Sequence, residues 1–267
     1  ISFYINFHKI KNKKIQMSTK EAGKIEEISY PNKDKYIGSA KDFKRIGFGV
    51  YTSHLGDKYI GNFEDDNRKG FGLEVYNDKD EFFGEWKDNR FNGQGQFSFS
   101  DGVTFKGYLS DSKMDGFGIL SFKKGGDYSG YFKEGKRKGY GVRIYINGDK
   151  YEGDWDKGVK EGYGRINFAN GDIYGGQFKN DKRNGYGVYR CKNGVIYMGE
   201  WKNDLRDGYG CYVFEDGTKY EGEYKNDERE GNSLEKNIQI KVMVVDFGCG
   251  YKVIIVHLIT LVAMEAL

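Results

Sequence analysis

Aromatic, glycine and charged positions alternate along this chain in a block of 23 residues that recurs nine times without insertion or deletion. Each block opens with an aromatic residue, a glycine follows two residues later, and an apolar, mostly aromatic residue comes two residues after that. A fixed period of this length is typical of repeat arrays, in which each unit packs mainly on its neighbours. The opening residues are Tyr36, Tyr59, Phe82, Phe105, Tyr128, Tyr151, Tyr174, Tyr197 and Tyr220.

The pattern inside one block predicts a β-hairpin. With the opening residue as offset zero, offsets zero, two and four are apolar or glycine and offsets one, three and five are mostly polar, as in a half-buried strand. Offsets five to ten are charged and predict the loop at the hairpin tip. A second strand is expected at offsets twelve to eighteen, as in Tyr163–Ala169, and an Asn-Gly-Asp or Asp-Gly turn leads into the next block.

Glycine falls on fixed offsets, which distinguishes it from the glycine of a flexible linker. Offsets two, eleven, thirteen and twenty hold 33 of the 40 glycines. Because glycine inside a strand marks a bulge or the close approach of another group, we expect each ring to lie over a neighbouring glycine. The rings at offsets twelve and seventeen, such as Tyr163 and Phe168, have opposite parity. Either the second strand carries a bulge or it is buried on both faces.

The combined pattern resembles the MORN repeat. Its elements are an aromatic-x-Gly-x-Trp opening, a polar loop, a G-x-G pair and a final Asp-Gly-Asp, and the segment YEGEYKN at 220–226 is similar to the family consensus almost letter for letter. The resemblance covers residues 36–233. It implies an all-β fold, an elongated, twisted, single-layer antiparallel sheet built from tandem hairpins.

An N-terminal extension, residues 1–35, precedes the array. Within it, Ile28, Tyr30 and Asp34 have the spacing of the end of a preceding block. We therefore expect a degenerate half-repeat that supplies a capping strand and covers the first edge of the sheet.

A C-terminal apolar tail or cap, residues 234–267, follows the array. Its longest uncharged run, Val253–Met264, is about twelve residues, whereas a membrane-spanning helix needs roughly 20. A strand or helix that caps the last repeat is the favoured interpretation, and a membrane helix is the alternative.

Charge and cysteine usage exclude some classes of function. The net charge is +3 with 31% charged residues, which argues against a nucleic-acid-binding protein because such proteins usually have a strongly basic domain. Cys191, Cys211 and Cys249 lack the spacing of metal ligands, and their odd number favours reduced thiols and an intracellular location.

The sequence predicts no catalytic centre, no cofactor and no metal site. The histidines, His8, His54 and His257, fall in three different regions, and an array that contacts only its neighbours does not bring such regions together. The G-x-G pairs, such as 139–141, lack the third glycine and the following helix of a dinucleotide-binding motif. The chain is therefore not expected to be an enzyme.

Two surfaces are candidate binding sites. A single-layer sheet leaves part of its aromatic face uncovered, and an exposed apolar groove of this kind usually binds something. We expect a partner helix or extended segment there, with aromatic anchors. The groove residues are Phe63, Trp86, Phe132, Trp155, Phe178, Trp201 and Tyr224.

The second surface is a basic ladder at the hairpin tips, which could meet an acidic phospholipid or an acidic protein tail. The alternative is that these tips are simply solvated, because acidic residues stand beside the ladder and partly cancel its charge. The ladder residues are Arg45, Arg68, Arg90, Lys113, Arg137, Lys160, Arg183, Arg206 and Arg229.

These features favour a non-catalytic scaffold or adaptor that binds a protein partner. The family resemblance implies a cytoskeletal setting, or a ciliary axoneme such as a radial spoke head, in a larger assembly or as a homodimer. Two alternatives remain: a peripheral membrane module that binds anionic phospholipid, and the regulatory repeats of a longer enzyme such as a phosphatidylinositol-phosphate kinase.

Overall fold

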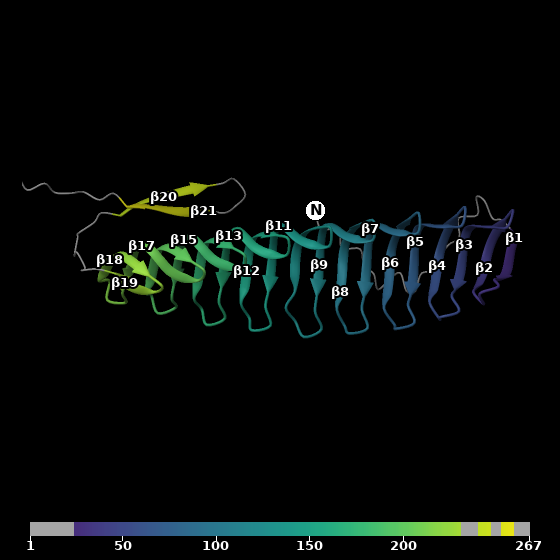
Figure 1. Cartoon of the computed structure of the whole chain (residues 1–267), viewed down its shortest axis with the longest axis horizontal. Helices are drawn as coiled ribbons and strands as arrows, with labels where there is room; N and C mark the ends of the chain where they lie inside the picture. Colours follow the sequence, from purple (N-terminus) through teal and green to yellow (C-terminus); the bar gives the residue numbers. More distant parts are fainter. Residues whose placement is uncertain (1–23, 231–239, 247–251, 259–267) are drawn as a thin grey trace, which may run out of the picture. The chain divides into compact units, whose positions relative to one another are not determined.

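The computed structural model describes residues 24–230, 240–246 and 252–258 (Figure 1). Every regular element among them is a β-strand. Two compact units divide the chain, residues 1–169 and residues 170–267. The prediction of an all-β fold built from tandem antiparallel hairpins is confirmed in both units.

The first unit is a single layer of thirteen strands, in which each strand pairs antiparallel with the next in chain order. At ~4.8 Å between strands the layer is about 60 Å wide, roughly twice the length of its longest strands. The strands are β1 (Lys24–Ser29), β2 (Lys35–Lys41), β3 (Lys44–Thr52), β4 (Lys58–Glu64), β5 (Asn67–Val75), β6 (Glu81–Lys87), β7 (Arg90–Ser98), β8 (Thr104–Ser110), β9 (Lys113–Ser121), β10 (Tyr128–Lys133), β11 (Lys136–Ile144), β12 (Lys150–Asp156) and β13 (Val159–Asn167).

The second unit repeats the same hairpins in six further strands that pair in chain order. They are β14 (Ile173–Lys179), β15 (Lys182–Arg190), β16 (Ile196–Lys202), β17 (Leu205–Val213), β18 (Lys219–Lys225) and β19 (Glu228–Glu230). A separate two-stranded antiparallel sheet follows, β20 (Ile240–Asp246) with β21 (Lys252–Leu258).

The two flanking regions are described only in part. Strand β1 pairs with β2, and Ile28 lies opposite Tyr36, in the position expected for a strand that precedes the first repeat. Residues 1–23 lie outside the described residues, as do residues 231–239, 247–251 and 259–267 of the expected tail or cap. Within the described ranges, no helix has the length and apolar character needed to cross a bilayer.

The hairpin tip is shorter than the sequence predicted. Strand β2 continues to Lys41 at offset five and β3 begins at Lys44 at offset eight, so only Asp42 and Phe43 form the turn. Both turn residues have positive φ, 50° and 62°, as in a two-residue type I′ turn. The expected six-residue loop is therefore wrong, and the expected second strand is present but begins four residues and ends two residues earlier than predicted. The charged residues around the tip belong to the two strands. The first strand reaches offset five, and the second runs from offset eight to offset sixteen.

A β-bulge lies at offset eleven of the second strand. In the pair of β12 and β13, Gly153 lies opposite Gly164 and Trp155 lies opposite Lys160, so the register shifts between them. Gly162, at offset eleven, has φ 76°, a left-handed conformation that glycine adopts without strain. The bulge lies before offset twelve, so it does not explain why the rings at offsets twelve and seventeen have opposite parity. The ring at offset twelve lies on the face opposite the buried rings, and the ring at offset seventeen follows the strand.

The core is a row of rings lying on glycines, as the sequence predicted. Tyr151 is fully buried, and its hydroxyl donates a hydrogen bond to the carbonyl of Asp154 at 2.8 Å. A Cβ atom added to Gly164 would lie 2.5 Å from the Tyr151 ring, and one added to Gly153 would lie 2.7 Å from its hydroxyl. The Tyr151 ring thus fills the space that side chains at positions 153 and 164 would otherwise occupy.

The offset-four residues join neighbouring repeats into one column. The indole of Trp155 packs edge-to-face on Tyr151 of its own repeat, at 5.2 Å between centroids, and on Tyr128 of the preceding repeat, at 5.4 Å. Its Nε1 donates to the carbonyl of Gly141 at 3.3 Å. Such edge-to-face pairs are favourable beyond the area they bury. The core therefore runs across the strands, and each repeat completes the core of its neighbour.

Candidate interaction surfaces

The face that carries the rings at offsets zero and four is called the inner face, and the opposite one the outer face. The residues predicted to form a groove lie on the inner face, but they are buried and do not form an open groove. Their neighbours in the column and the side chains at offsets nine and fifteen enclose them. The exposed fractions are 4% for Phe63, 3% for Trp86, 4% for Phe132, 3% for Trp155, 3% for Phe178, 6% for Trp201 and 2% for Tyr224.

The arginines at offset nine fold back over this column, so they do not point into solvent. The guanidinium of Arg45 lies 4.9 Å from the Phe63 centroid and 5.3 Å from that of Tyr51. Its Nε donates to Asp66 Oδ1 at 2.9 Å and its Nη2 to the Asp66 carbonyl at 3.0 Å. Cation–π attraction, together with the ion pair, favours this arrangement over an extended side chain.

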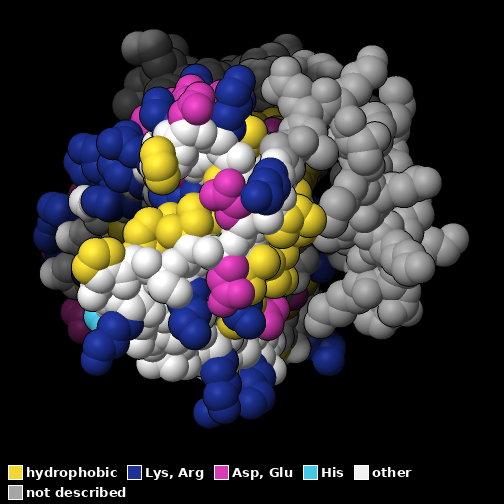
Figure 2. All heavy atoms as spheres, turned by 90° about the vertical axis from the view of Figure 1, so that its right-hand side faces the viewer, with side chains coloured by type: hydrophobic (Ala, Val, Ile, Leu, Met, Phe, Trp, Pro, Cys, Tyr) yellow, Lys and Arg dark blue, Asp and Glu magenta, His cyan; other side chains and the backbone are white. Residues whose placement is uncertain are grey.

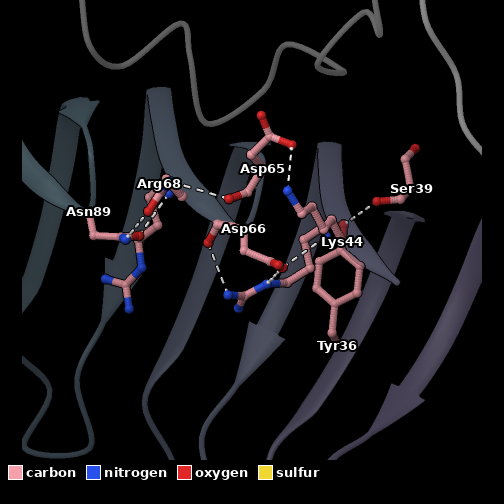
Figure 3. A network of polar contacts seen from close by, with 9 residues as sticks. Tyr36, Ser39, Lys44, Asp65, Asp66, Arg68 and Asn89 are labelled. Carbon is pink, nitrogen blue, oxygen red and sulfur yellow. Dashed lines mark hydrogen bonds and ion pairs between the residues drawn. The ribbon is translucent and has the colours of Figure 1, made fainter. Parts of the chain in front are cut away.

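The same contacts join consecutive hairpin tips. The backbone N–H of Arg45 also donates to Asp66 Oδ1 at 2.9 Å, and Figure 3 shows Asp66 beside the Lys44–Asp65 pair and the Arg68–Asn89 contact. Burial raises the pKa of the Asp66 carboxyl, but the hydrogen bonds from Arg45 outweigh burial and leave the pKa lower than its ordinary value. The Asp66 carboxylate therefore remains charged and holds the arginine in place.

The prediction of a free basic ladder is therefore wrong for most of its members. Six arginines lie over rings, Arg45, Arg68, Arg137, Arg183, Arg206 and Arg229, and Lys160 lies over Tyr145 and Tyr151. Only Arg90 and Lys113, at offset eight, extend outward, with side chains 64% and 56% exposed. These two form ion pairs with Asp111 and Glu134 of the next tip.

Two repeats lack a basic lid at offset nine. Phe91 and Met114 occupy offset nine in the repeats at 82–104 and 105–127, and both are half-buried. Phe91 packs 4.0 Å from Phe82 and 5.0 Å from Phe97, between ring centroids. In these two repeats, apolar side chains form the outermost layer of the inner face. We call it the apolar window, and it comprises Phe91, Phe97, Phe99, Met114 and Leu120.

An aspartate at offset twenty-one links repeats at the opposite end of the hairpins, and the sequence reasoning missed this role. The buried Asp34 accepts hydrogen bonds from the N–H and Nδ1 of His54, at 2.8 and 3.0 Å, from Asn32 Nδ2 at 2.7 Å and from the Tyr51 hydroxyl. The Tyr51 hydroxyl and His54 hold the pKa of the Asp34 carboxyl well below its usual range. The recurring Asn-Gly-Asp turn was the signal that could have revealed this link.

Asp57, Asp80, Asp149 and Asp172 repeat the contact. Each accepts the backbone N–H found twenty residues later, at 2.7–3.0 Å. The turn aspartates are therefore structural ties between repeats.

The outer face carries exposed rings at offset twelve. Phe71, Phe117, Tyr140 and Tyr163 are 56%, 45%, 40% and 61% exposed. The expectation that these rings lie over glycines, as the offset-zero rings do, is wrong, because offset twelve points to the opposite face. Viewed from its β1 end, the first unit also shows hydrophobic side chains between charged groups of both signs (Figure 2).

Candidate metal ligands are not gathered into a site in the described part of the chain. It contains no group of three or more His, Cys, Asp or Glu placed to hold a metal ion. Cys191 and Cys211 are free thiols, and burial raises the pKa of the Cys211 thiol to about 11. His54 belongs to the Asp34 link, and His8 lies outside the described residues.

A profile of the family described as MORN repeat matches eight consecutive segments of the chain, 59–81, 82–104, 105–127, 128–150, 151–173, 174–196, 197–219 and 220–232. Residues 36–58 precede the match, and their strands β2 and β3 form the same hairpin with the same bulge. The comparison with curated proteins gave no match.

Solved structures give only distant similarity. The TCP10 domain of Danio rerio CPAP, as its E1021V mutant, is 11% identical with a TM-score of 0.43, covering 79% of this chain and 99% of that one. The TCP domain of Drosophila melanogaster SAS-4 (dCPAP), in complex with a proline-rich motif of Ana2 (dSTIL), is 16% identical with a TM-score of 0.31, covering 75% and 90%. Likeness at this level does not bear on function.

Proposed function

Because this chain belongs to the MORN repeat family, whose members are generally protein- or membrane-interaction modules, we propose that it is a non-catalytic scaffold that binds a protein partner on its inner face. The contact region is the apolar window. A cytoskeletal or ciliary assembly inside the cell is the proposed setting, and its support is the family resemblance.

The observation that carries this proposal is the missing lid at two neighbouring repeats. Elsewhere an arginine, or Lys160 in one repeat, shields the column, and the side chains of Arg45, Arg68, Arg183 and Arg206 are only 20–26% exposed. In the window, Phe99 is 36% exposed and stacks on Phe97 at 5.5 Å. Apolar surface that a neighbouring element does not cover favours contact with another molecule.

The size of the window fits a short apolar segment. Two repeats span about 20 Å across the strands, the length of roughly 13 residues of α-helix. A helix or extended segment with apolar residues on one side would cover Phe99, Met114 and Leu120. Arg68 and Arg137 flank the window, so acidic residues at the ends of the segment would fit best.

A substitution that rebuilds the lid tests the proposal. Arg137, in the next repeat, lies 4.1 Å over Trp155 and donates from Nη2 to the Gly158 carbonyl at 2.5 Å. Met114 has the equivalent neighbours, Phe132 and Gly135. We expect Met114→Arg to fold over Phe132 in the same way, to close the window and to leave stability nearly unchanged.

The measurement is proximity labelling and co-purification with the tagged full chain in cells that express the protein. Met114→Arg should lose about tenfold or more of a partner retained by the wild type, the effect of ~1.4 kcal/mol of lost contact. Ile146→Arg is the control. It adds the same charge at a residue that is 73% exposed, and this variant should retain the partner. Equal retention by Met114→Arg, or no protein retained above an empty tag, would refute the proposal.

Vesicles containing phosphatidylserine separate this function from membrane binding. Since most ladder arginines are engaged with rings and carboxylates, we expect little co-sedimentation at physiological salt. Strong, salt-sensitive co-sedimentation of the wild type, lost on substituting Arg90 and Lys113, would favour the phospholipid alternative instead.

A further inference from the structure

The outer face of the first unit carries a second row of exposed rings, separate from the apolar window. The residues at offset twelve recur once per hairpin, and the strands that bear them follow one another in chain order (Figure 1). Gln94 interrupts the row, but Tyr108 lies directly opposite it and its hydroxyl accepts a hydrogen bond from Gln94 Nε2 at 2.7 Å. A ring is therefore present at this level in each repeat.

We name this row the outer track. Its members are 40–61% exposed, which is high for aromatic side chains within a sheet. The outer track comprises Phe71, Phe117, Tyr140 and Tyr163 at offset twelve, together with Tyr108 and Tyr131, which lie at offset three on adjacent strands.

The bulge holds the backbone of the track in place. The strand pairing is interrupted there, and a side chain at offset three accepts the N–H at offset twelve: Asp154 Oδ2 accepts from Tyr163 N at 3.1 Å and Glu85 Oε1 from Gln94 N at 3.1 Å. Tyr163 therefore projects from a fixed backbone, which reduces the conformational entropy lost on binding.

The glycine at offset eleven faces the outer side, and beside Tyr140 it leaves open space. A Cβ atom at Gly162 would meet the Asp154 side chain at 2.9 Å, which shows that offset eleven faces the outer side. At Gly139, next to Tyr140, the same added atom would meet nothing within 4 Å. The open space beside Tyr140 would admit a proline ring packed against the tyrosine.

The spacing of the track selects among partner conformations. Equivalent residues of successive hairpins are two strands apart, about 9.6 Å. Polyproline II has three residues per turn and rises ~3.1 Å per residue, so one turn advances ~9.3 Å and returns the same face. Over four repeats the mismatch is only ~1 Å. Seven residues of α-helix advance ~10.5 Å and accumulate ~4 Å of mismatch. A β-strand would present alternate faces at a three-residue spacing.

The charges beside the track are paired with each other. Lys138 Nζ lies 2.7 Å from Asp156 Oδ1, and Lys133 Nζ lies 3.0 Å from Asp115 Oδ2. In these two pairs the opposite charges neutralise each other beside the track, so charge complementarity favours an uncharged segment there.

We propose that the outer track binds a proline-rich segment in the polyproline II conformation, one turn per repeat. The inference rests on the proposed protein-binding function but uses a different face of the sheet. The experiment uses the full chain with fluorescein-labelled dodecaproline as probe and a glycine-serine peptide of the same length as control. Binding is read by fluorescence anisotropy.

Dodecaproline should bind saturably, and the glycine-serine peptide should not. The double variant Tyr140→Ser/Tyr163→Ser should weaken binding by about tenfold or more, because aromatic anchors dominate such contacts. Phe43→Ser removes a ring that is 99% exposed at a hairpin tip and should leave binding unchanged. Absence of saturable binding by the wild type, or equal binding by the double variant or by the glycine-serine peptide, would overturn the proposal.

A second measurement needs no variant. Dodecaproline should protect Tyr140 and Tyr163 of the wild type from nitration by tetranitromethane, read by peptide mass spectrometry, and unchanged nitration would contradict the proposal. Met114→Arg should leave dodecaproline binding intact, since it lies on the inner face. Failure of the inner-face proposal and failure of the proline-binding proposal can therefore be told apart, because each has its own measurement.

Discussion

Gly164 shows how strictly a single position is constrained by the ring above it. The Tyr151 hydroxyl is tied to the Asp154 carbonyl, so the ring cannot move away from an added methyl group 2.5 Å from it. Gly164→Ala should destabilise the fold by about 1–3 kcal/mol, as other overpacked core sites do. Urea unfolding measures the loss. Gly175→Ala is the matched control, because its added Cβ meets nothing within 4 Å, and an equal loss in both would contradict this explanation.

A carboxylate with a depressed pKa gives stability that acid removes. Asp34 is held charged by Tyr51 and His54, so its folded pKa lies below the ordinary value near 3.9. The stability it contributes is present above the unfolded pKa and is lost as pH falls toward the folded pKa. Unfolding free energy should therefore fall between about pH 5 and pH 3 in the wild type, and less so in Asp34→Asn. Identical pH profiles by urea unfolding would refute this role.

At the scale of the element, neighbouring hairpins are joined by a repeated arginine–aspartate contact. Arg183 donates from its backbone N, Nε and Nη2 to Asp204 at 2.9, 3.1 and 2.8 Å, and its guanidinium lies 4.2 Å from the Trp201 centroid. A double-mutant cycle with Arg183→Met and Asp204→Asn should give a coupling free energy of about 0.5–1 kcal/mol, since both side chains are partly exposed. The coupling should shrink as salt is raised, and a salt-independent value would show that packing carries it.

The sequence predicted the hairpin but not its tip. Asp42 and Phe43 form a two-residue turn, because these residues adopt positive φ, and nothing in a run of charged residues distinguishes such a turn from a loop. The folded-back arginines were also beyond reach, since the ring that Arg45 covers, Phe63, belongs to the next repeat. One signal was available: Arg at offset nine occurs with Asp at offset seven of the following block in three cases, Arg45/Asp66, Arg183/Asp204 and Arg206/Asp227.

At the scale of the whole molecule, periodicity determines the fold and its exceptions mark the candidate contacts. The 23-residue period was sufficient to predict an all-β array, because each repeat completes the core of its neighbour. The inner-face contact depends on where the pattern fails, at Phe91 and Met114 in place of arginine. The outer track depends on side-chain direction at a bulge, which a sequence period does not encode. The two candidate contact faces could therefore be located only from the three-dimensional structure.

The ties between repeats also bear on how such a chain can change length. Each tie links one residue to another in the adjacent block, about 20 positions away, as in Asp57 with Asn77 or Arg45 with Asp66. Removal of 23 residues from within the array would join two partial blocks into a complete one with the same tie. The sheet would shorten by a fixed step of ~9.6 Å, and every remaining strand would keep its neighbours. Gene rearrangements that add or delete whole blocks can therefore adjust the reach of this protein in discrete increments.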